Sequence, residues 1–181
     1  MISDKNLVWI DLEMTGLNIE RDVILEIATI ITDSELNVIA QGPTFIIHQP
    51  DSALASMDEI VKNMHAKSGL TERVRFSRVS LHEAYEQTFA FIKQYCVKNS
   101  AMLAGNSVWQ DRAFLTKYMP EIVHYLHYRI IDISAIKMLV RRWYPKNLYV
   151  DFKKPDTHRA LEDIKQSIEE LKHYRNYFFI K

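Results

Sequence analysis

Three apolar runs rich in valine and isoleucine occupy the first fifty positions of the chain. They span residues 6–13, 22–33 and 37–49. Such runs favour β-strands because branched and aromatic side chains fit a pleated surface. The segments between them, one around Gly16 and one over residues 33–37, carry the glycine and polar residues that are typical of turns. The pattern predicts three strands joined as an antiparallel meander.

From residue 51 onward, apolar residues recur at intervals of three and four, which is the period of an amphipathic helix. The clearest case spans 80–99, where Ser80 precedes the first apolar residue as an N-cap. Short apolar runs then alternate with helical segments that end at Pro120 and Pro145. The pattern predicts two strands over 101–106 and 128–134 and three helices over 107–120, 134–145 and 157–178.

Strands that alternate with helices after an antiparallel start indicate an α/β fold. We expect a mixed sheet of about five strands flanked by helices. A length of 181 residues fits one domain with a substantial core, which we place over residues 1–181. The longest segment without clear periodicity is 144–156, and loops of this length are often functional.

Composition excludes several classes of protein. The formal net charge is zero, so any site for a polyanion must be built from a local concentration of charge. A single cysteine, Cys96, excludes a disulfide framework and a cysteine-built zinc site. The chain has neither the apolar stretch of a membrane helix nor the pattern of a signal peptide, so we expect no membrane partner and a cytoplasmic protein.

Two acids interrupt the first predicted strand. Asp11 and Glu13 share one face of the strand with Trp9, because side chains alternate across a strand. Two carboxylates on one face repel each other and lose hydration on burial unless a positive charge lies between them. The pair is therefore either a solvent-exposed strand end or half of a cation site.

Further polar residues lie on the predicted helices. Asp111 shares the face of Phe114 and Leu115, so it is either an ordinary surface acid or part of a site at the edge of the core. Asp163 flanks the apolar stripe of the last helix, which places it beside the sheet as a candidate ligand. His158 falls on the other side of that helix axis, as a surface residue or at the mouth of a site.

An α/β sandwich can bring Asp11, Glu13, Asp111 and Asp163 to one end of its first strand. Four carboxylates without cysteine suit hard cations, Mg²⁺ or Mn²⁺, rather than zinc. Two such ions activate a water and stabilise the leaving oxygen in phosphodiester cleavage. A neutral imidazole such as that of His158 can accept the proton of the water. Together, these residues predict a two-metal phosphodiesterase site.

The order of three motifs, "DLE", "NSVWQD" and "HRALED", resembles that of the DEDD exonucleases, in the subgroup with histidine in the third motif. The longer segments "WIDLEMTGL", "GNSVWQDRAFLTKYMP", "HYRIIDIS" and "RRWYP" resemble the oligoribonuclease family in particular. This resemblance runs from about Asn6 to Phe179. It implies an RNase H-like fold, a homodimer, and removal of 5′-mononucleotides from the 3′ end of very short single-stranded RNAs, above all dinucleotides.

The resemblance also implies a role for individual residues. By motif, Asp11, Glu13, Asp111 and Asp163 hold two divalent ions and His158 is the general base. Leu17 is expected to wedge against a base and Ser107 to lie at the substrate, with His65 as a further substrate contact. Arg129, Ser134 and Lys137 of the partner subunit are expected to cap the 5′-phosphate.

The charge distribution is consistent with such a cap. Between Lys137 and Arg159 there are seven Lys or Arg residues against two acids. This is either a solvated basic surface or a local site for a polyanion. Arginine binds phosphate through two donors, which favours Arg129 as the anchor. One position departs from the family pattern: Ile60 stands where the family usually has tryptophan, so it offers apolar contact without an aromatic face for stacking.

Two alternative functions remain open. A catalytically inactive relative that only binds nucleic acid is disfavoured because all five catalytic positions are intact. A 3′–5′ DNA exonuclease would share the same catalytic residues. The contacts by which an enzyme distinguishes RNA from DNA cannot be identified from the sequence.

Overall fold

The computed structural model describes residues 2–153 and 159–179. It contains five strands: β1 (Leu7–Met14), β2 (Ile24–Thr32), β3 (Val38–Ile46), β4 (Met102–Gly105) and β5 (Ile130–Asp132). The longer helices are α2 (Glu59–Lys67), α4 (Leu81–Tyr95), α5 (Val108–Tyr118), α7 (Ile133–Trp143) and α8 (Ala160–Phe178). Three shorter helices are α1 (Asp51–Ala55), α3 (Leu70–Phe76) and α6 (Pro120–Tyr125).

The five strands form one sheet in the order β3-β2-β1-β4-β5. β1 pairs with β2, and β2 with β3, in antiparallel orientation. β1 and β4, and β4 and β5, pair in parallel. The sheet confirms the predicted meander and the predicted mixed α/β architecture. Because β1 and β4 are parallel, their carboxyl ends lie at the same edge of the sheet.

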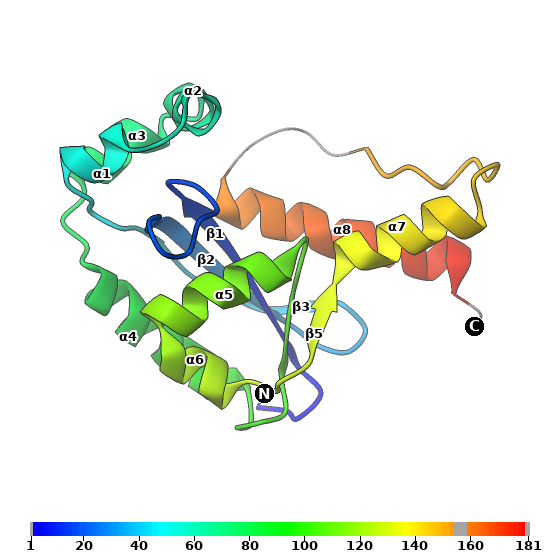
Figure 1. Cartoon of the computed structure of the whole chain (residues 1–181). Helices are drawn as coiled ribbons and strands as arrows, with labels where there is room; N and C mark the ends of the chain where they lie inside the picture. Colours follow the sequence, from blue (N-terminus) through cyan, green and yellow to red (C-terminus); the bar gives the residue numbers. More distant parts are fainter. Residues whose placement is uncertain (1, 154–158, 180–181) are drawn as a thin grey trace.

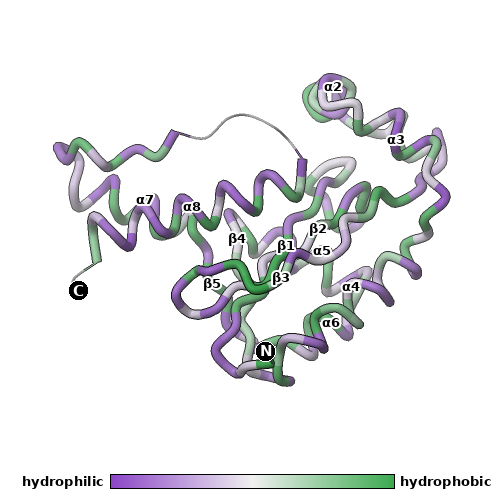
Figure 2. The backbone as a smooth tube through the Cα atoms, turned by 180° about the vertical axis from the view of Figure 1, so that it is seen from behind, coloured by the Kyte–Doolittle hydropathy of each residue, from purple (hydrophilic) through white to green (hydrophobic). Residues whose placement is uncertain are grey.

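Helices cover both faces of the sheet (Figure 1). On one face, Val8, Ile10 and Leu12 of β1 join a core with α4, α5 and α6. On the other face, Trp9 joins a core with α7 and α8 that includes Ile164. The strands at the centre are the most hydrophobic part of the chain trace, and polar residues concentrate on the outer helices (Figure 2). The observed alternation of β1 matches the alternation predicted from the sequence.

The three helices α1, α2 and α3 form a small group over the end of the meander (Figure 1). They pack on β2 through a separate apolar cluster of Leu25, Leu54, Met57, Leu70 and Val74. This group carries Ile60 and His65 and so borders the edge of the sheet where β1 ends.

The structure differs from the sequence prediction around Pro120. The helix predicted over 107–120 ends at Tyr118, and Pro120 begins α6, which the sequence analysis did not predict. Proline is well suited to the first position of a helix, and six residues are too few to show a clear period. The expected cap of the last helix, Thr157, lies outside the described residues. Among the helices that are described, none is both long and apolar enough to span a membrane.

Candidate active site

Three carboxylates converge where β1 meets the start of α8. Asp11 and Glu13 point to the α8 side of the sheet, like Trp9 two residues earlier. Asp163 lies in the first turn of α8 and faces them. One carboxylate oxygen from each of the three residues lies within 4.8 Å of the others. The structure therefore brings together three of the four acids that the sequence analysis selected as metal ligands.

The fourth acid, Asp111, reaches the same strand from the opposite face. Its Oδ1 accepts a hydrogen bond from the backbone N–H of Leu12 at 2.9 Å, and the residue is buried. Leu12 lies between Asp11 and Glu13, so this bond attaches the first turn of α5 to the middle of the acidic strand. Asp111 lies outside the group of three whose oxygens are within 4.8 Å, yet it is close enough to raise the pKa of Asp11.

A tight turn after β4 sets the position of α5. Ser107 has a left-handed backbone, with φ of 49°, and its N–H donates to Asp132 Oδ1 at 3.1 Å. A Cβ atom at Gly105 would stand 3.1 Å from Val108 Cγ2, a tight contact, so glycine favours a helix that starts this close to the strand. The turn brings α5 to the carboxyl edge of the sheet, where β1 also ends.

Burial and mutual repulsion dominate the electrostatics of these acids. Burial, with the neighbouring charges of Asp163, Glu26 and Asp111, raises the pKa of Glu13 to about 8. Burial, followed by the charges of Asp111 and Glu13, raises the pKa of Asp11 well above its ordinary value. Burial also raises the pKa of Asp111 to about 7, against the lowering effect of the Leu12 hydrogen bond. Burial and the neighbouring acids therefore shift each of these carboxyl groups toward its protonated form.

The side chains fit divalent cations. They offer only carboxylate oxygens, the donors preferred by Mg²⁺ and Mn²⁺. Asp11, Glu13 and Asp163 would hold an ion between them, with Asp111 beside Asp11 for a second.

A further buried acid, Glu26, belongs to the surroundings of this cluster and was missed by the sequence analysis. Glu26 is the Cα partner of Glu13 across the β1–β2 ladder and is fully buried. Arg159 neutralises it through two hydrogen bonds, Nε to Oε2 at 3.1 Å and Nη2 to Oε1 at 2.8 Å. The available signal was an acid within an otherwise apolar strand, as for Asp11 and Glu13.

Comparison with known proteins gives the family. A family model described as exonuclease matches residues 8–171. An oligoribonuclease of Pseudomonas paraeruginosa is 53% identical over 178 residues, 98% of each chain. An oligoribonuclease of Vibrio cholerae is 54% identical over 177 residues, which cover 98% of this chain and 97% of that protein. The chain belongs to the oligoribonuclease branch of the exonuclease family.

A solved structure shows that the fold is shared more widely. Escherichia coli exonuclease I, in complex with a dT13 oligonucleotide, superposes with a TM-score of 0.74 at 15% sequence identity. The superposition covers 97% of the chain described here and 42% of exonuclease I. The chain therefore spans less than half of that larger protein. The likeness confirms the predicted RNase H-like exonuclease fold.

The residues that the family resemblance assigns to substrate lie on several different elements of this exonuclease. Leu17 is 68% exposed, in the turn that follows β1, and its carbonyl accepts a hydrogen bond from Gln110 Nε2 at 2.9 Å. His65 is completely buried; its Nε2 lies 2.8 Å from the Met14 carbonyl and its Nδ1 3.9 Å from Glu13 Oε2. In this conformation His65 supports the end of β1 and Glu13, and a direct contact with substrate stays a prediction.

The residues predicted to cap a 5′-phosphate lie on the side of β5 and α7. Ser107 is exposed, and its hydroxyl donates to Ser134 Oγ of the same chain at 3.1 Å. Arg129 is exposed, with its guanidinium 4.7 Å from the centre of the Tyr128 ring. The Nζ of Lys137 lies 3.4 Å from the buried carboxylate of Glu170. Ser107 and Ser134 are thus brought together within one chain. A cap supplied by a second subunit stays a prediction.

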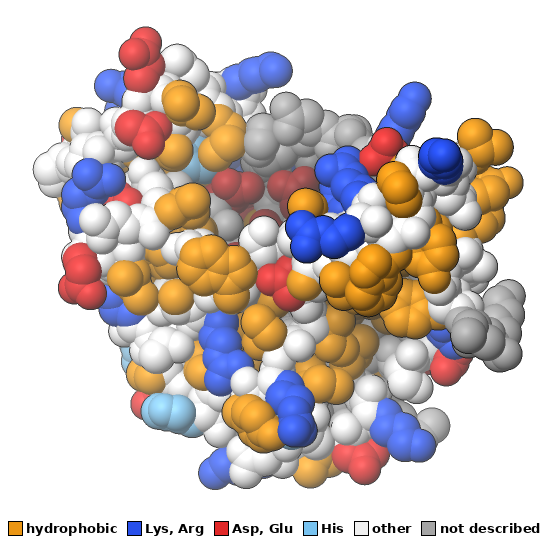
Figure 3. All heavy atoms as spheres, turned by 45° about the vertical axis from the view of Figure 1, so that its right-hand side comes forward, with side chains coloured by type: hydrophobic (Ala, Val, Ile, Leu, Met, Phe, Trp, Pro, Cys, Tyr) orange, Lys and Arg blue, Asp and Glu red, His pale blue; other side chains and the backbone are white. Residues whose placement is uncertain are grey.

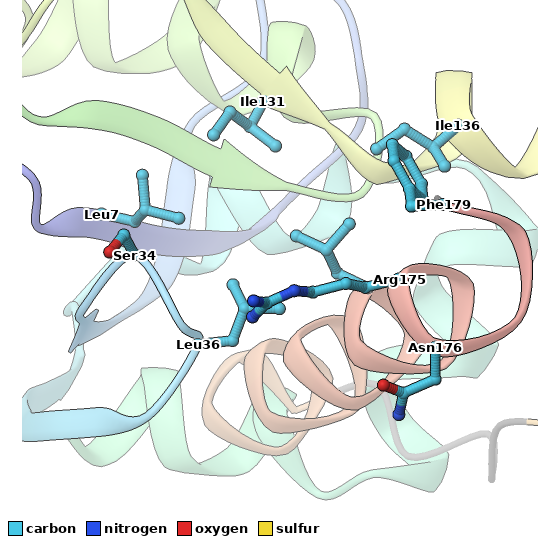
Figure 4. A pocket seen from close by; sticks show the side chains of 9 residues that line it. Leu7, Ser34, Leu36, Ile131, Ile136, Arg175, Asn176 and Phe179 are labelled. Atoms are coloured by element: carbon cyan, nitrogen blue, oxygen red, sulfur yellow. The ribbon is translucent and has the colours of Figure 1, made fainter. Parts of the chain in front are cut away.

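The predicted general base, His158, lies outside the described residues, which resume at Arg159. On the visible face, acidic side chains lie in a hollow bordered by hydrophobic ones (Figure 3). A separate cavity of about 670 Å³ lies at the amino end of β1, between Leu7, Ile131 and Arg175 (Figure 4). It is at the opposite end of the strand from Glu13 and is not part of the candidate active site.

Proposed function

We propose that this chain is a 3′–5′ exoribonuclease that degrades very short oligoribonucleotides, above all dinucleotides, to 5′-mononucleotides. The convergence of Asp11, Glu13 and Asp163 within 4.8 Å is the observation that carries this proposal. It supports a cation site at the carboxyl end of β1, in a protein whose relatives are named oligoribonucleases. Mg²⁺ or Mn²⁺ are the ions we expect.

The carboxylates bind cations and so prepare the site for an anionic substrate. Two divalent ions held by Asp11, Glu13, Asp111 and Asp163 would supply the charge that polarises the attacking water and stabilises the leaving oxygen. The Leu12 N–H keeps Asp111 in place, and α8 delivers Asp163 from the other face. Pre-ordered ligands of this kind reduce the reorganisation needed during the reaction.

His158 acts in the proposal as the general base. Its neutral imidazole accepts a proton from the water that attacks the phosphorus atom. The bond between phosphorus and the 3′-oxygen of the preceding nucleotide breaks, and that oxygen is released protonated. The products are a 5′-mononucleotide and an RNA shorter by one residue.

We further propose a homodimer in which Arg129, Ser134 and Lys137 of the partner subunit cap the 5′-phosphate. Exposed apolar side chains on α7 support an interface there, since Met138, Leu139 and Trp143 are exposed by 57%, 43% and 64%. Hydrophobic side chains gather on the face to which α7 contributes (Figure 3). A cap at the 5′-phosphate would also limit the length of RNA that fits. A cytoplasmic site of action stays a prediction from the sequence.

Hydrolysis of a 5′-phosphorylated diribonucleotide in Mn²⁺ tests the function directly. We expect two mononucleotides, formed faster than the first nucleotide is released from a twenty-residue RNA. Equal rates on both would overturn the preference for dinucleotides. The matching deoxydinucleotide separates this proposal from a DNA exonuclease, which would cleave it at least as fast. Asp11→Asn controls for contaminating nucleases.

A further inference from the structure

A network of largely buried polar side chains joins α8 to the turn that follows β4. Asn106, the residue directly after β4, donates from Nδ2 to Ser167 Oγ at 2.7 Å and to Glu170 Oε2 at 3.3 Å. Ser167 and Glu170 belong to α8 and are buried. Hydrogen-bonded networks inside a protein hold their members in one arrangement. The network therefore fixes α8 against the end of β4.

The network continues to a candidate metal ligand. Ser167 Oγ donates to the backbone carbonyl of Asp163 at 2.7 Å, one helical turn earlier. At the other end of the network, Asn106 precedes Ser107, the residue from which α5 starts, and α5 carries Asp111 in its first turn. The same few hydrogen bonds thus connect α5 and α8, the two helices that bring acids to β1.

Two attachments hold α8 on either side of β1. The first is the Arg159–Glu26 ion pair, which ties the helix to β2. The second is the bond between Ser167 and Asn106, which ties it to the end of β4. In the sheet, β2 and β4 are the two neighbours of β1. Asp163 lies four residues after the first attachment and four before the second, so it faces β1 from between two fixed points.

Glu170 sets the orientation of the Asn106 amide. Glu170 is fully buried, and its Oε1 lies 3.4 Å from Lys137 Nζ and accepts a hydrogen bond from the Tyr174 hydroxyl at 2.9 Å. Lys137 offsets the charge of the buried carboxylate. An amide nitrogen has two hydrogens, and here one is directed to Glu170 Oε2 and the other to Ser167. The carboxylate therefore holds the amide in the rotation that reaches Ser167.

We propose that Asn106, Ser167 and Glu170 are positioning residues that hold the ligand-bearing turn of α8 in place and so strengthen binding of a divalent ion by the carboxylate cluster. This inference rests on the proposed function, since it concerns the same metal site. The three residues act through the backbone of Asp163 rather than as ligands. Residues that orient metal ligands typically contribute about 10–100-fold to metal affinity or activity.

Ser167→Ala tests the bridge, because it removes one hydroxyl and leaves the Glu170–Lys137 charge pair intact. We expect Mn²⁺ to bind about tenfold more weakly in calorimetric titration of the RNA-free protein, which should stay folded in EDTA. Thr116→Ala is the matched control. The Thr116 hydroxyl makes the same local bond on α5, to the Arg112 carbonyl at 2.7 Å, from an exposed position. Its loss should leave the Mn²⁺ affinity unchanged.

Two variants of the buried carboxylate test the other end of the network. Glu170→Gln puts an amide nitrogen opposite either Asn106 or Lys137, which are both donors, so it should also weaken Mn²⁺ binding. Tyr174→Phe removes a bond to the same carboxylate but spares the one to Asn106, and it should leave the Mn²⁺ affinity unchanged. Equal Mn²⁺ affinity in Ser167→Ala and the wild type would overturn the proposal. A loss in Tyr174→Phe as large as in Glu170→Gln would also overturn it and indicate a purely structural role.

Hydrolysis of a diribonucleotide separates this inference from the proposed function. Weaker Mn²⁺ binding by Ser167→Ala, in a protein that hydrolyses no RNA, would overturn the function but retain the positioning role. A wild type that binds no Mn²⁺ would overturn both. In an active enzyme, Ser167→Ala should lose kcat at limiting Mn²⁺ and regain most of it at saturating Mn²⁺, with KM for the RNA unchanged. A kcat that stays low at saturating Mn²⁺, with unaltered Mn²⁺ affinity, would contradict the proposal.

Discussion

Arg159 and Glu26 form a two-point ion pair that attaches the start of α8 to β2. The two N–O distances are 3.1 and 2.8 Å, and Glu26 is the Cα partner of Glu13. Arg159 neutralises an acid directly beside the candidate metal ligands, and its charge lowers the pKa of Glu13 against the larger raising effects of burial, Asp163, Glu26 and Asp111. It also fixes the helix that carries Asp163.

We therefore expect Arg159→Ala to lower the free energy of unfolding by about 2 kcal/mol, because it leaves the buried Glu26 charge without its partner. The double variant Glu26→Gln/Arg159→Ala removes that charge and should recover much of the loss. Urea unfolding of the two single variants and the double variant measures the coupling. A double variant that is less stable than Arg159→Ala alone would contradict this explanation.

Much of this arrangement could be predicted from the sequence. The alternation of β1 placed Asp11 and Glu13 on the face opposite Ile10 and Leu12, and the structure has them there. Helical spacing put Asp163 beside the sheet. These results were accessible because strand and helix periods are local properties of the chain.

Other features depend on contacts that local periodicity does not report. The hydrogen bond from Leu12 to Asp111 joins residues 99 positions apart, and the Arg159–Glu26 pair joins residues 133 positions apart. The burial of His65 follows from how α2 packs on the end of β1, which its own spacing does not specify. For the same reason, the sequence located the ligands but not the residues that support them.

The stability of the metal-free protein should fall as pH rises. Glu13 has a pKa of about 8 in the folded chain against an ordinary value of 4.5. Between these values the folded state retains a proton that the unfolded state has lost, so the stabilisation present at acid pH is lost as pH rises through about 8. Thermal unfolding in EDTA from pH 5 to 8 measures this.

Divalent ions should reverse the trend, because they bind the ionised carboxylates. We expect Mn²⁺ to raise the melting temperature more at pH 8 than at pH 6, and Glu13→Gln to flatten the pH dependence in EDTA. A metal-free protein that becomes more stable between pH 6 and 8 would show that the carboxylates are not held in the unfavourable environment described here.

Asp163→Ala should reduce turnover by about three orders of magnitude while the protein remains folded. Asp163 contributes one of three clustered oxygens, and removing it also relieves repulsion on Glu13. The variant should therefore be at least as stable as the wild type in EDTA. The neighbouring Glu162→Ala is the matched control, since Glu162 is exposed and pairs with Lys165. Turnover that survives Asp163→Ala would remove this residue from the metal site.

Ile60→Trp should lower KM for a dinucleotide, because an exposed ring on α2 would add stacking worth about 1–3 kcal/mol to the apolar contact that isoleucine offers. Ile60 is 81% exposed, so the larger side chain fits without disturbing the core. Ile60→Leu controls for a change of shape alone. An unchanged KM would mean that the 3′-terminal base makes no contact with α2 or already has another partner.

Introducing a charge on α7 tests the proposed homodimer. Trp143 is 64% exposed and lines a cavity of about 400 Å³ together with Leu139, Tyr144 and Phe178. If a second copy covers this surface, Trp143→Glu should convert the dimer to a monomer, since an interface core excludes unpaired charge. Light scattering measures the mass, and the monomer should lose its preference for a 5′-phosphorylated over an unphosphorylated dinucleotide. A variant monomer that keeps this preference would show that Arg129 and Lys137 act within their own chain.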